Sequence, residues 1–155
     1  MDDDFFMRLA IAEAKAAAAE GEIPVGAVIT HNDKVVGTGR NARLAASSPL
    51  AHAEMEALTA AARELGTWRF DDCTLYVTLE PCPMCAGALV QTRIHRLVYG
   101  TKDPRAGAAG SLYDIPRDPR LTHRCIVQNG LLAAECAEVL WRFFAERRKK
   151  KSEPL

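Results

Sequence analysis

The sequence lacks any long apolar run. Hydrophobic residues make up 48% of the 155-residue chain, but no uninterrupted stretch approaches the roughly 18 residues that a membrane-spanning helix needs. The first residues, Asp2, Asp3 and Asp4, are acidic where a secretory signal would be basic. We therefore expect a cytoplasmic protein that does not associate with a membrane.

A net charge is also missing, because 20 basic residues balance 20 acidic ones. This balance argues weakly against a general nucleic-acid binder, which usually carries net positive charge. The basic residues are nevertheless concentrated near the C-terminus, where Glu146 is the one acid among Arg142, Arg147, Arg148, Lys149, Lys150 and Lys151. Two interpretations stay open: a solvated helix end whose cations favour the helix dipole, or a surface that contacts phosphates.

The cysteines do not form the even set expected of a disulfide framework. There are five, and the expected cytoplasmic setting argues against disulfides as well. Cys73, Cys125 and Cys136 lie in apolar patterns, which is typical of small buried side chains. Cys82 and Cys85 differ, because a C-x-x-C pair can be either a metal site or a thioredoxin-like redox pair.

The order of predicted elements indicates an α/β fold. Hydrophobic periodicity and turn residues predict helices over 4–20, 51–65 and 82–91, strands over 25–30, 35–39, 74–79, 96–100 and 124–127, and mostly loop over 101–122. A final amphipathic helix carries Leu132, Cys136, Val139, Leu140, Phe143 and Phe144 as an apolar stripe. Strands that alternate with helices predict a three-layer sandwich, with a central five-stranded mixed sheet flanked by helices. We expect one domain over 1–155 with a basic C-terminal helix.

Two short motifs carry the chemistry. His52-Ala53-Glu54 opens one predicted helix, and Pro81-Cys82-Pro83-Met84-Cys85 opens another directly after a strand. Each is weak alone, since a single histidine near a helix start is usually structural. In this order they match the H-x-E…P-C-x-x-C signature of zinc deaminases.

The residue types suit a catalytic zinc ion, one per chain. Cys82 and Cys85 are three residues apart, so their sulfurs can reach one point from a first helical turn. The positive end of the helix dipole favours the thiolate forms that bind metal. With the imidazole of His52 they make three ligands, and tetrahedral zinc keeps its fourth position for water.

Glu54 is the predicted catalytic residue. It is two residues from His52, about 200° around a helix, so both can serve one site only if the metal lies off the helix end. Zinc lowers the pKa of bound water to about 7. Glu54 could take that proton and return it to a ring nitrogen and to the leaving amine. The alternative is an exposed first-turn acid that stabilises the dipole. For Glu80 a strand-end role and contact with the metal ligands both stay open.

The metal motif and several segments outside it carry a resemblance to a known family. They are residues 24–28, Asn41, 52–54, 78–88, 99–100, Asp103, 107–112, and the tail around 130–132 and Phe143-Phe144. Over nearly its whole length the chain resembles the bacterial tRNA-specific adenosine deaminases, which convert the wobble adenosine of an anticodon to inosine. The zinc motif is shared by many deaminases, so residues 107–112 and the C-terminal helix are what favour this family.

The resemblance implies a cytidine deaminase-like fold, a tRNA anticodon stem-loop as partner, and a homodimer. It implies that Asn41 binds the target nucleotide and that Asp103 contacts its neighbour or the sugar. Without the resemblance, Asn41 would be an ordinary turn asparagine and Asp103 a turn initiator before Pro104.

Three rival functions remain at this point. The first is the same chemistry on a free base, nucleoside or nucleotide. The second is a zinc-stabilised RNA-binding module, from which an essential Glu54 would distinguish an enzyme. The third is a dithiol redox protein, which would leave His52 and Glu54 without a role.

Overall fold

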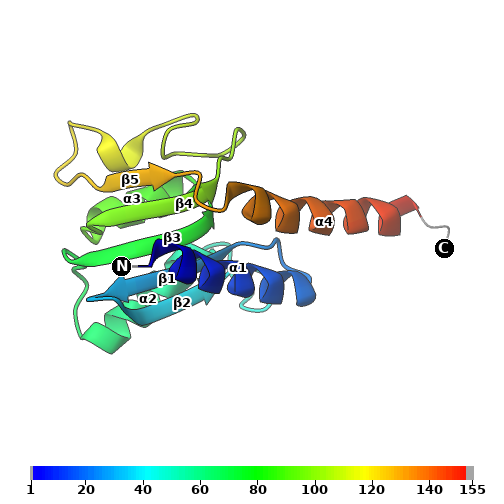
Figure 1. The fold of residues 1–155 in the computed structure, drawn as a ribbon, viewed down its shortest axis with the longest axis horizontal. Coiled ribbons are helices and arrows are strands. Elements are labelled where there is room, and N and C mark those ends of the chain that lie inside the picture. The colour runs from blue at the N-terminus through cyan, green and yellow to red at the C-terminus, as the bar shows by residue number, and fades with distance from the viewer. Residues whose placement is uncertain (1, 153–155) are drawn as a thin grey trace.

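A five-stranded mixed sheet forms the centre of the computed structural model, which describes residues 2–152 (Figure 1). The strands are β1 (Gly26–His31), β2 (Lys34–Arg40), β3 (Cys73–Leu79), β4 (Arg96–Thr101) and β5 (Ile126–Asn129), in the order β2-β1-β3-β4-β5. β1 runs antiparallel to both β2 and β3, whereas β3, β4 and β5 are parallel. The predicted five-stranded mixed sheet is confirmed. The expected extent of 1–155 includes residues 1 and 153–155, which lie outside the described range.

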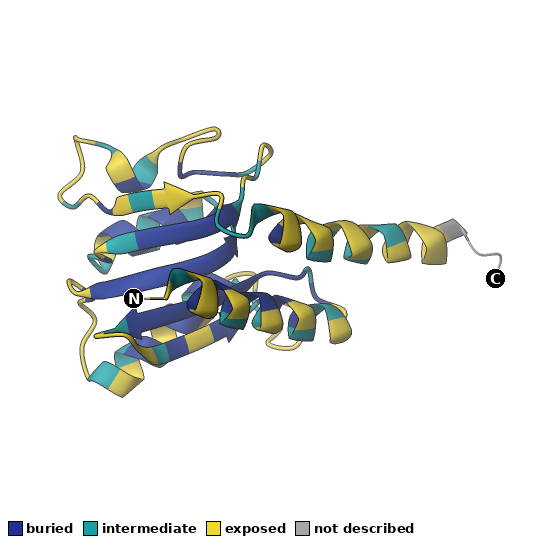
Figure 2. Ribbon diagram, in the orientation of Figure 1, coloured by how far each residue is buried: buried dark blue, intermediate teal, exposed yellow. Residues whose placement is uncertain are grey.

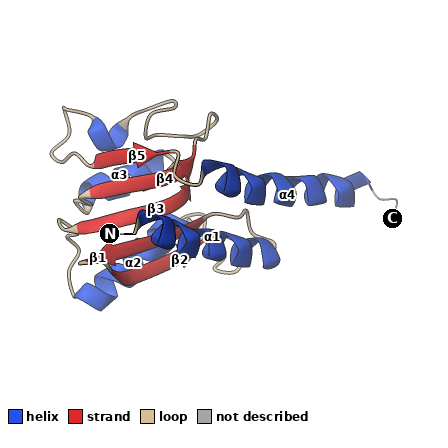
Figure 3. Cartoon of the chain, viewed as in Figure 1, coloured by secondary structure: helices blue, strands red, loops and turns tan. Residues whose placement is uncertain are grey.

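Helices cover both faces of this sheet. They are α1 (Asp3–Ala19), α2 (Ala53–Leu65), α3 (Pro83–Gln91) and α4 (Ala133–Ser152), with a short 3₁₀ turn η1 at Ile115–Arg117. Figure 3 shows α1 in front of the strands, α2 and α3 behind them, and α4 projecting past the strand ends, while the start of α4 shares a core with α1. α1 packs on β1, β2 and β3, α4 packs on β4 and β3, and α2 packs on β2 and β1. The three-layer sandwich expected from the element order is therefore confirmed.

The central strands are buried on both sides (Figure 2). In β3, Leu75 and Val77 join the core under α2 and α3, while Tyr76 between them joins the core under α1. This alternation follows from the two-residue period of a strand. It explains why the sequence of β3 reads as a nearly continuous apolar run.

The first two strands form a tight hairpin. Asn32 and Asp33 have φ of 51° and 59°, the left-handed pair typical of a type I′ turn. His31 pairs with Lys34 across it. The gap between the predicted strands 25–30 and 35–39 is therefore a hairpin turn.

The last strand begins two residues later than predicted. The backbone N–H of Cys125 donates to the carbonyl of Pro116, so this residue is held by the η1 turn and not by the sheet. Pairing with β4 starts at Ile126, which lies opposite Arg96. The prediction of a strand over 124–127 was therefore wrong at its start and short at its end.

α2 lies unusually close to β2. A Cβ atom added to Gly39 would lie 2.2 Å from the carbonyl oxygen of Ala53, and one added to Gly37 would lie 2.5 Å from that of Ala57. Only glycine leaves room for the helix backbone at this distance. The first turn of α2 is thereby fixed against the strand.

α4 extends well beyond the sheet (Figure 1). Near its start Cys136 is buried and Val139 packs against the same core. Farther along, Trp141 is 66% exposed and Phe144 is 38% exposed. The predicted apolar stripe therefore covers the core only over the first turns. Within the described residues no helix has the length and apolar character needed to cross a membrane.

Candidate metal centre and cleft

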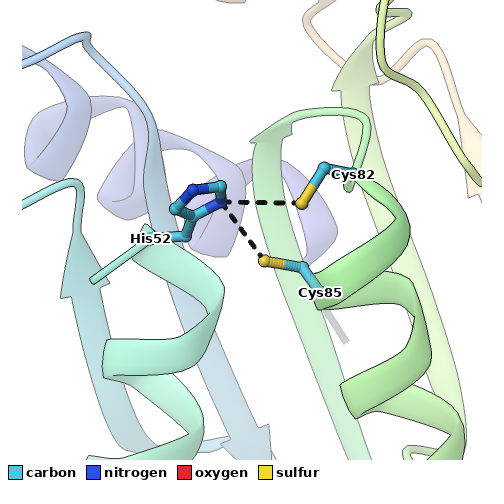
Figure 4. Close-up of side chains that lie close together, drawn as sticks. All are labelled: His52, Cys82 and Cys85. Carbon is cyan, nitrogen blue, oxygen red and sulfur yellow. Dashed lines mark hydrogen bonds between the residues drawn. The ribbon is translucent and has the colours of Figure 1, made fainter. Parts of the chain in front are cut away.

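The three predicted zinc ligands converge at the starts of two helices (Figure 4). His52 is the N-cap of α2 and Cys82 is the N-cap of α3, with Cys85 in the first turn of α3. The Nδ1 atom of His52 lies 3.6 Å from Sγ of Cys82 and 3.5 Å from Sγ of Cys85. Among the described residues, these form the one group of three or more potential metal ligands.

This spacing fits a tetrahedral zinc ion. Zinc lies about 2.3 Å from a thiolate sulfur and about 2.0 Å from an imidazole nitrogen, so two such ligands at a tetrahedral angle are about 3.5 Å apart. The two Nδ1–Sγ distances agree with that value. One nitrogen and two sulfurs are also a donor set that zinc prefers. The site fits one zinc ion per chain.

The two thiols share a negative charge. A hydrogen bond from the Cys85 thiol lowers the pKa of Cys82 to about 5, against the opposing effect of burial, and the backbone N–H of Cys85 and His52 help. The pKa of Cys85 lies well above its usual range, because its thiol donates to Cys82 and because it is buried. At neutral pH, Cys82 is a thiolate that is ready for a cation. A dication would also displace the proton of Cys85.

Glu54 is buried in the first turn of α2. Its side chain is 3% exposed, so the alternative of an exposed acid is wrong. Burial raises the pKa of this carboxyl to about 7, and the negative charge of Cys82 adds to the effect. A carboxyl with such a pKa can both hold and release a proton near neutral pH.

A cleft of about 630 Å³ opens beside these residues. It brings together five of the six residues that the sequence singled out, and Cys85 lies beneath them. Its lining is Ile23, Val25, Asn41, Arg43, His52, Glu54, Leu79, Glu80, Cys82, residues 102–106, Leu140, Trp141, Phe144 and Arg148.

Asn41 forms one wall of the cleft. It is 6% exposed, and its backbone N–H donates to the carbonyl of Val25. No described residue hydrogen-bonds its side-chain amide, which lines the cleft. The loop that follows is held by Glu22, itself 3% exposed, which accepts from the backbone N–H groups of Leu44 and Ala45 at 3.0 Å each. No local pattern in the sequence indicated this role of Glu22.

Asp103 lies on the opposite wall. Its Oδ1 accepts from the backbone N–H groups of Arg105 and Ala106 at 3.0 and 3.2 Å, so the turn predicted at this residue is present. Its backbone N–H donates to Oε1 of Glu80 at 3.1 Å. Asp103 therefore shapes the loop and also lines the cleft.

Glu80 is a buried acceptor of several hydrogen bonds. It is 2% exposed and accepts from the backbone N–H groups of Asp103, Ala109 and Ser111 and from the Ser111 hydroxyl. Burial acts to raise the pKa of Glu80, but these hydrogen bonds, those from Ser111 foremost, lower it overall. Glu80 is thus a carboxylate that organises the 103–111 loop.

Cationic side chains surround the cleft, namely Arg43, Lys102, Arg105 and Arg148. Within the basic tail, the residues play different parts. Arg148 lines the cleft, Arg147 stacks on the ring of Phe143 at 5.0 Å, and Arg142 pairs with Glu138. The basic tail therefore includes both solvated helix cations and a residue placed at the cleft.

The hydrophobic wall of the cleft comes from Leu140, Trp141 and Phe144 of α4. Leu140 and Phe144 belong to the predicted apolar stripe, which indicated burial against the sheet, whereas Trp141 was not part of that stripe. Arg43 and Lys102 carried no local signal either, because each lies in a loop whose path is set by distant contacts.

Known proteins share this architecture and motif. Residues 1–101 match the family described as the cytidine and deoxycytidylate deaminase zinc-binding region. The chain belongs to this deaminase family. The match includes His52, Glu54, Cys82 and Cys85, and it places the chain among zinc-dependent hydrolytic deaminases.

Individual members of the deaminase family are similar over nearly the full chain. A tRNA-specific adenosine deaminase of Bacillus subtilis is 45% identical, covering 96% of this chain and 92% of its own. A structure solved in a study of A-to-I editing by tRNA:A34 deaminases has a TM-score of 0.85 at 40% identity, covering 88% and 99% of the two chains. A guanine deaminase from Nitrosomonas europaea has a TM-score of 0.77 at 25% identity, covering 93% and 85%.

Proposed function

We propose that the protein is a zinc-dependent hydrolase that converts adenosine to inosine at the wobble position of a tRNA anticodon. The observation that carries the proposal is the His52, Cys82 and Cys85 triad at the base of a cleft with a cationic rim. The similarity to tRNA-specific adenosine deaminases over nearly the full chain supports the choice of substrate.

The reaction replaces the exocyclic amine of adenine by oxygen from water and releases ammonia. When bound, zinc would supply a water of lowered pKa, close to 7, as the nucleophile. His52, Cys82 and Cys85 would hold the ion, and Glu54 would move protons. Its carboxylate would accept a proton from water, deliver it to a ring nitrogen, and then assist the departure of the amine.

Both walls of the cleft supply substrate contacts in this proposal. The free amide of Asn41 offers a donor and an acceptor to the target nucleotide. The carboxylate of Asp103 would contact the neighbouring nucleotide or its sugar. The cations Arg43, Lys102, Arg105 and Arg148 would contact phosphates, which a free base lacks. An anticodon loop is single-stranded, so its base can enter the cleft at modest energetic expense.

A comparison of substrates tests the function directly. The zinc-loaded protein is incubated with an anticodon stem-loop that carries wobble adenosine, and product nucleosides are separated by chromatography. The matched RNA control has its adenosine elsewhere in the loop, and the small-molecule arms contain adenosine, cytidine and guanine. We expect inosine only from the wobble stem-loop. Turnover of a free base or nucleoside without turnover of the RNA would contradict the proposal and support the small-molecule alternative.

A single variant separates an enzyme from a zinc-stabilised RNA-binding module. Glu54→Gln keeps the size of the buried side chain but cannot accept a proton. We expect it to keep zinc and RNA binding and to lose turnover. A redox function would instead require a metal-free protein with a reversible Cys82–Cys85 disulfide.

We also propose a homodimer of single-domain chains in the cytoplasm, where tRNA modification takes place. The continuous sheet supports one domain over 1–155. Adjacent exposed side chains, Leu112 at 55% and Tyr113 at 61%, support an apolar contact with a second copy. Sedimentation equilibrium would give twice the chain mass if this is correct, and a monomer at micromolar concentration would contradict it.

A further inference from the structure

The 103–111 loop beside the cleft is organised around one buried carboxylate. We propose that Glu80 is a positioning residue, which fixes the 103–111 loop so that Asp103 faces the substrate. This inference rests on the proposed function, because it assigns the loop to substrate recognition. It adds a residue that selects the substrate without contacting it.

All of the accepting capacity of Glu80 is directed at the loop. Oε1 accepts from the backbone N–H of Asp103 at 3.1 Å and from the Ser111 hydroxyl. Oε2 accepts from the backbone N–H groups of Ala109 and Ser111, at 3.0 Å each. The side chain borders the cleft, but Glu80 as a whole is 2% exposed. It therefore has no accepting position left for a substrate, which argues for positioning and against direct contact.

The loop also packs tightly against the Glu80 side chain. A Cβ atom added to Gly107 would lie 2.3 Å from Cδ of Glu80, so the loop backbone passes directly against the carboxylate. Next to it, the backbone N–H of Ala108 donates to the carbonyl of Pro81 at 2.8 Å. Because Pro81 immediately precedes Cys82, the loop is anchored to the same short segment that presents a metal ligand.

This arrangement determines where the Asp103 carboxylate lies. The backbone N–H of Asp103 is held by Glu80, and its Oδ1 is held by the turn to Arg105 and Ala106. Without the first anchor, the turn could move as a unit relative to Cys82. The substrate contacts on this wall would then be lost, while the chemistry around Glu54 would stay in place.

The test uses Glu80→Gln, with Glu135→Gln as the matched control. The carboxamide of glutamine keeps one accepting oxygen and replaces the other by an NH₂ group. That NH₂ group faces two of the four hydrogen-bond donors of the loop and cannot accept from them. Glu135 forms an exposed ion pair with Arg8 and is not among the residues that line the cleft. We expect Glu80→Gln to raise KM for the stem-loop by about tenfold to a hundredfold, the effect of losing one or two substrate hydrogen bonds. We expect kcat to stay within about threefold of wild type, because the loss of even one catalytic contact would lower it by more than that. The zinc content should be unchanged.

Hydrogen exchange of the whole zinc-loaded protein provides the second readout. Amides of residues 103–111 should exchange faster in Glu80→Gln than in Glu135→Gln. Should Glu80→Gln fail to fold, Ser111→Ala removes a single hydroxyl and should give a smaller change of the same kind. Unchanged KM and exchange would overturn the inference, and so would a loss of kcat and zinc at unchanged KM. If wild-type protein leaves the stem-loop unreacted, the proposed function fails, and exchange alone decides whether Glu80 holds the loop.

Discussion

Adding a methyl group to Gly39 of β2 should impair catalysis, because it would push on the backbone of α2, the helix whose start carries His52 and Glu54. In Gly39→Ala the new Cβ would lie 2.2 Å from the carbonyl oxygen of Ala53 and 2.6 Å from the backbone nitrogen of Ala57. Carbon and oxygen atoms that are not bonded need about 3.3 Å, so α2 must retreat by about 1 Å. Backbone atoms cannot rotate away as a flexible side chain could.

The magnitude follows from that displacement. Overpacking of this kind costs about 1–3 kcal/mol of folding free energy. Because Ala53 lies between His52 and Glu54, the shift also moves the proposed metal ligand and the proposed proton carrier relative to Cys82. A misplacement of about 1 Å can lower the rate by roughly a hundredfold. We therefore expect lower stability together with a much lower kcat.

Thr38→Ala is the matched control, because Thr38 lies on the same strand and its side chain is exposed. Chemical unfolding of the zinc-loaded proteins gives the stabilities, and the stem-loop assay gives kcat. The control should lose at most about 1 kcal/mol, the range of strand propensities, and should keep wild-type kcat. Equal stability and equal kcat in the two variants would refute the argument from close approach.

Three further predictions concern single groups. Glu54→Gln should lower kcat by about a hundredfold to ten-thousandfold, as expected for loss of a general acid–base, with zinc content unchanged by atomic absorption; a fully active variant would contradict the role. Chelation should lower the unfolding midpoint and added zinc should restore it, because the ligands join α2 to α3; Cys82→Ala should bind less zinc and respond less to the chelator. Asp3 is hydrogen-bonded and ion-paired with Arg96, which lowers the pKa of its carboxyl below 3.8. Because the carboxyl has a lower pKa in the folded than in the unfolded protein, it stabilises the fold above about pH 3.8. This stabilisation is lost as the pH falls through the pKa of Asp3 in the folded protein. Asp3→Asn should therefore be less stable than wild type at pH 7 in urea unfolding, and the difference should narrow below pH 3.8; a gap that is independent of pH would contradict the ion pair.

The metal centre could be predicted because the spacing of its residues within short segments of the sequence is sufficient to indicate it. Cys82 and Cys85 are one helical turn apart, and proline at the helix start is visible in the sequence. The proximity of His52 to both sulfurs required the fold, but two helices that start at the same edge of a sheet bring their first residues together. The spacing of the motif and the element order together were therefore enough to predict that these three side chains converge.

The walls of the cleft could not be predicted in the same way. The path of residues 103–111 depends on Glu80, more than twenty residues earlier, and no periodicity reveals that the two are bonded. The start of β5 depends on a hydrogen bond from the backbone N–H of Cys125 to the carbonyl of Pro116, because this bond keeps Cys125 out of the sheet. Phe144 lies on the helical stripe that predicts burial, yet α4 extends past the sheet and Phe144 lines the cleft.

Glu22 has a consequence for the energetics of association. It already holds Leu44 and Ala45 in the free protein, so the conformational entropy of that loop is lost during folding and not when RNA arrives. Association then needs fewer contacts to reach a given affinity. The wall that carries Asn41 should accordingly have the same shape with and without RNA, so that the free protein is already a template for its ligand.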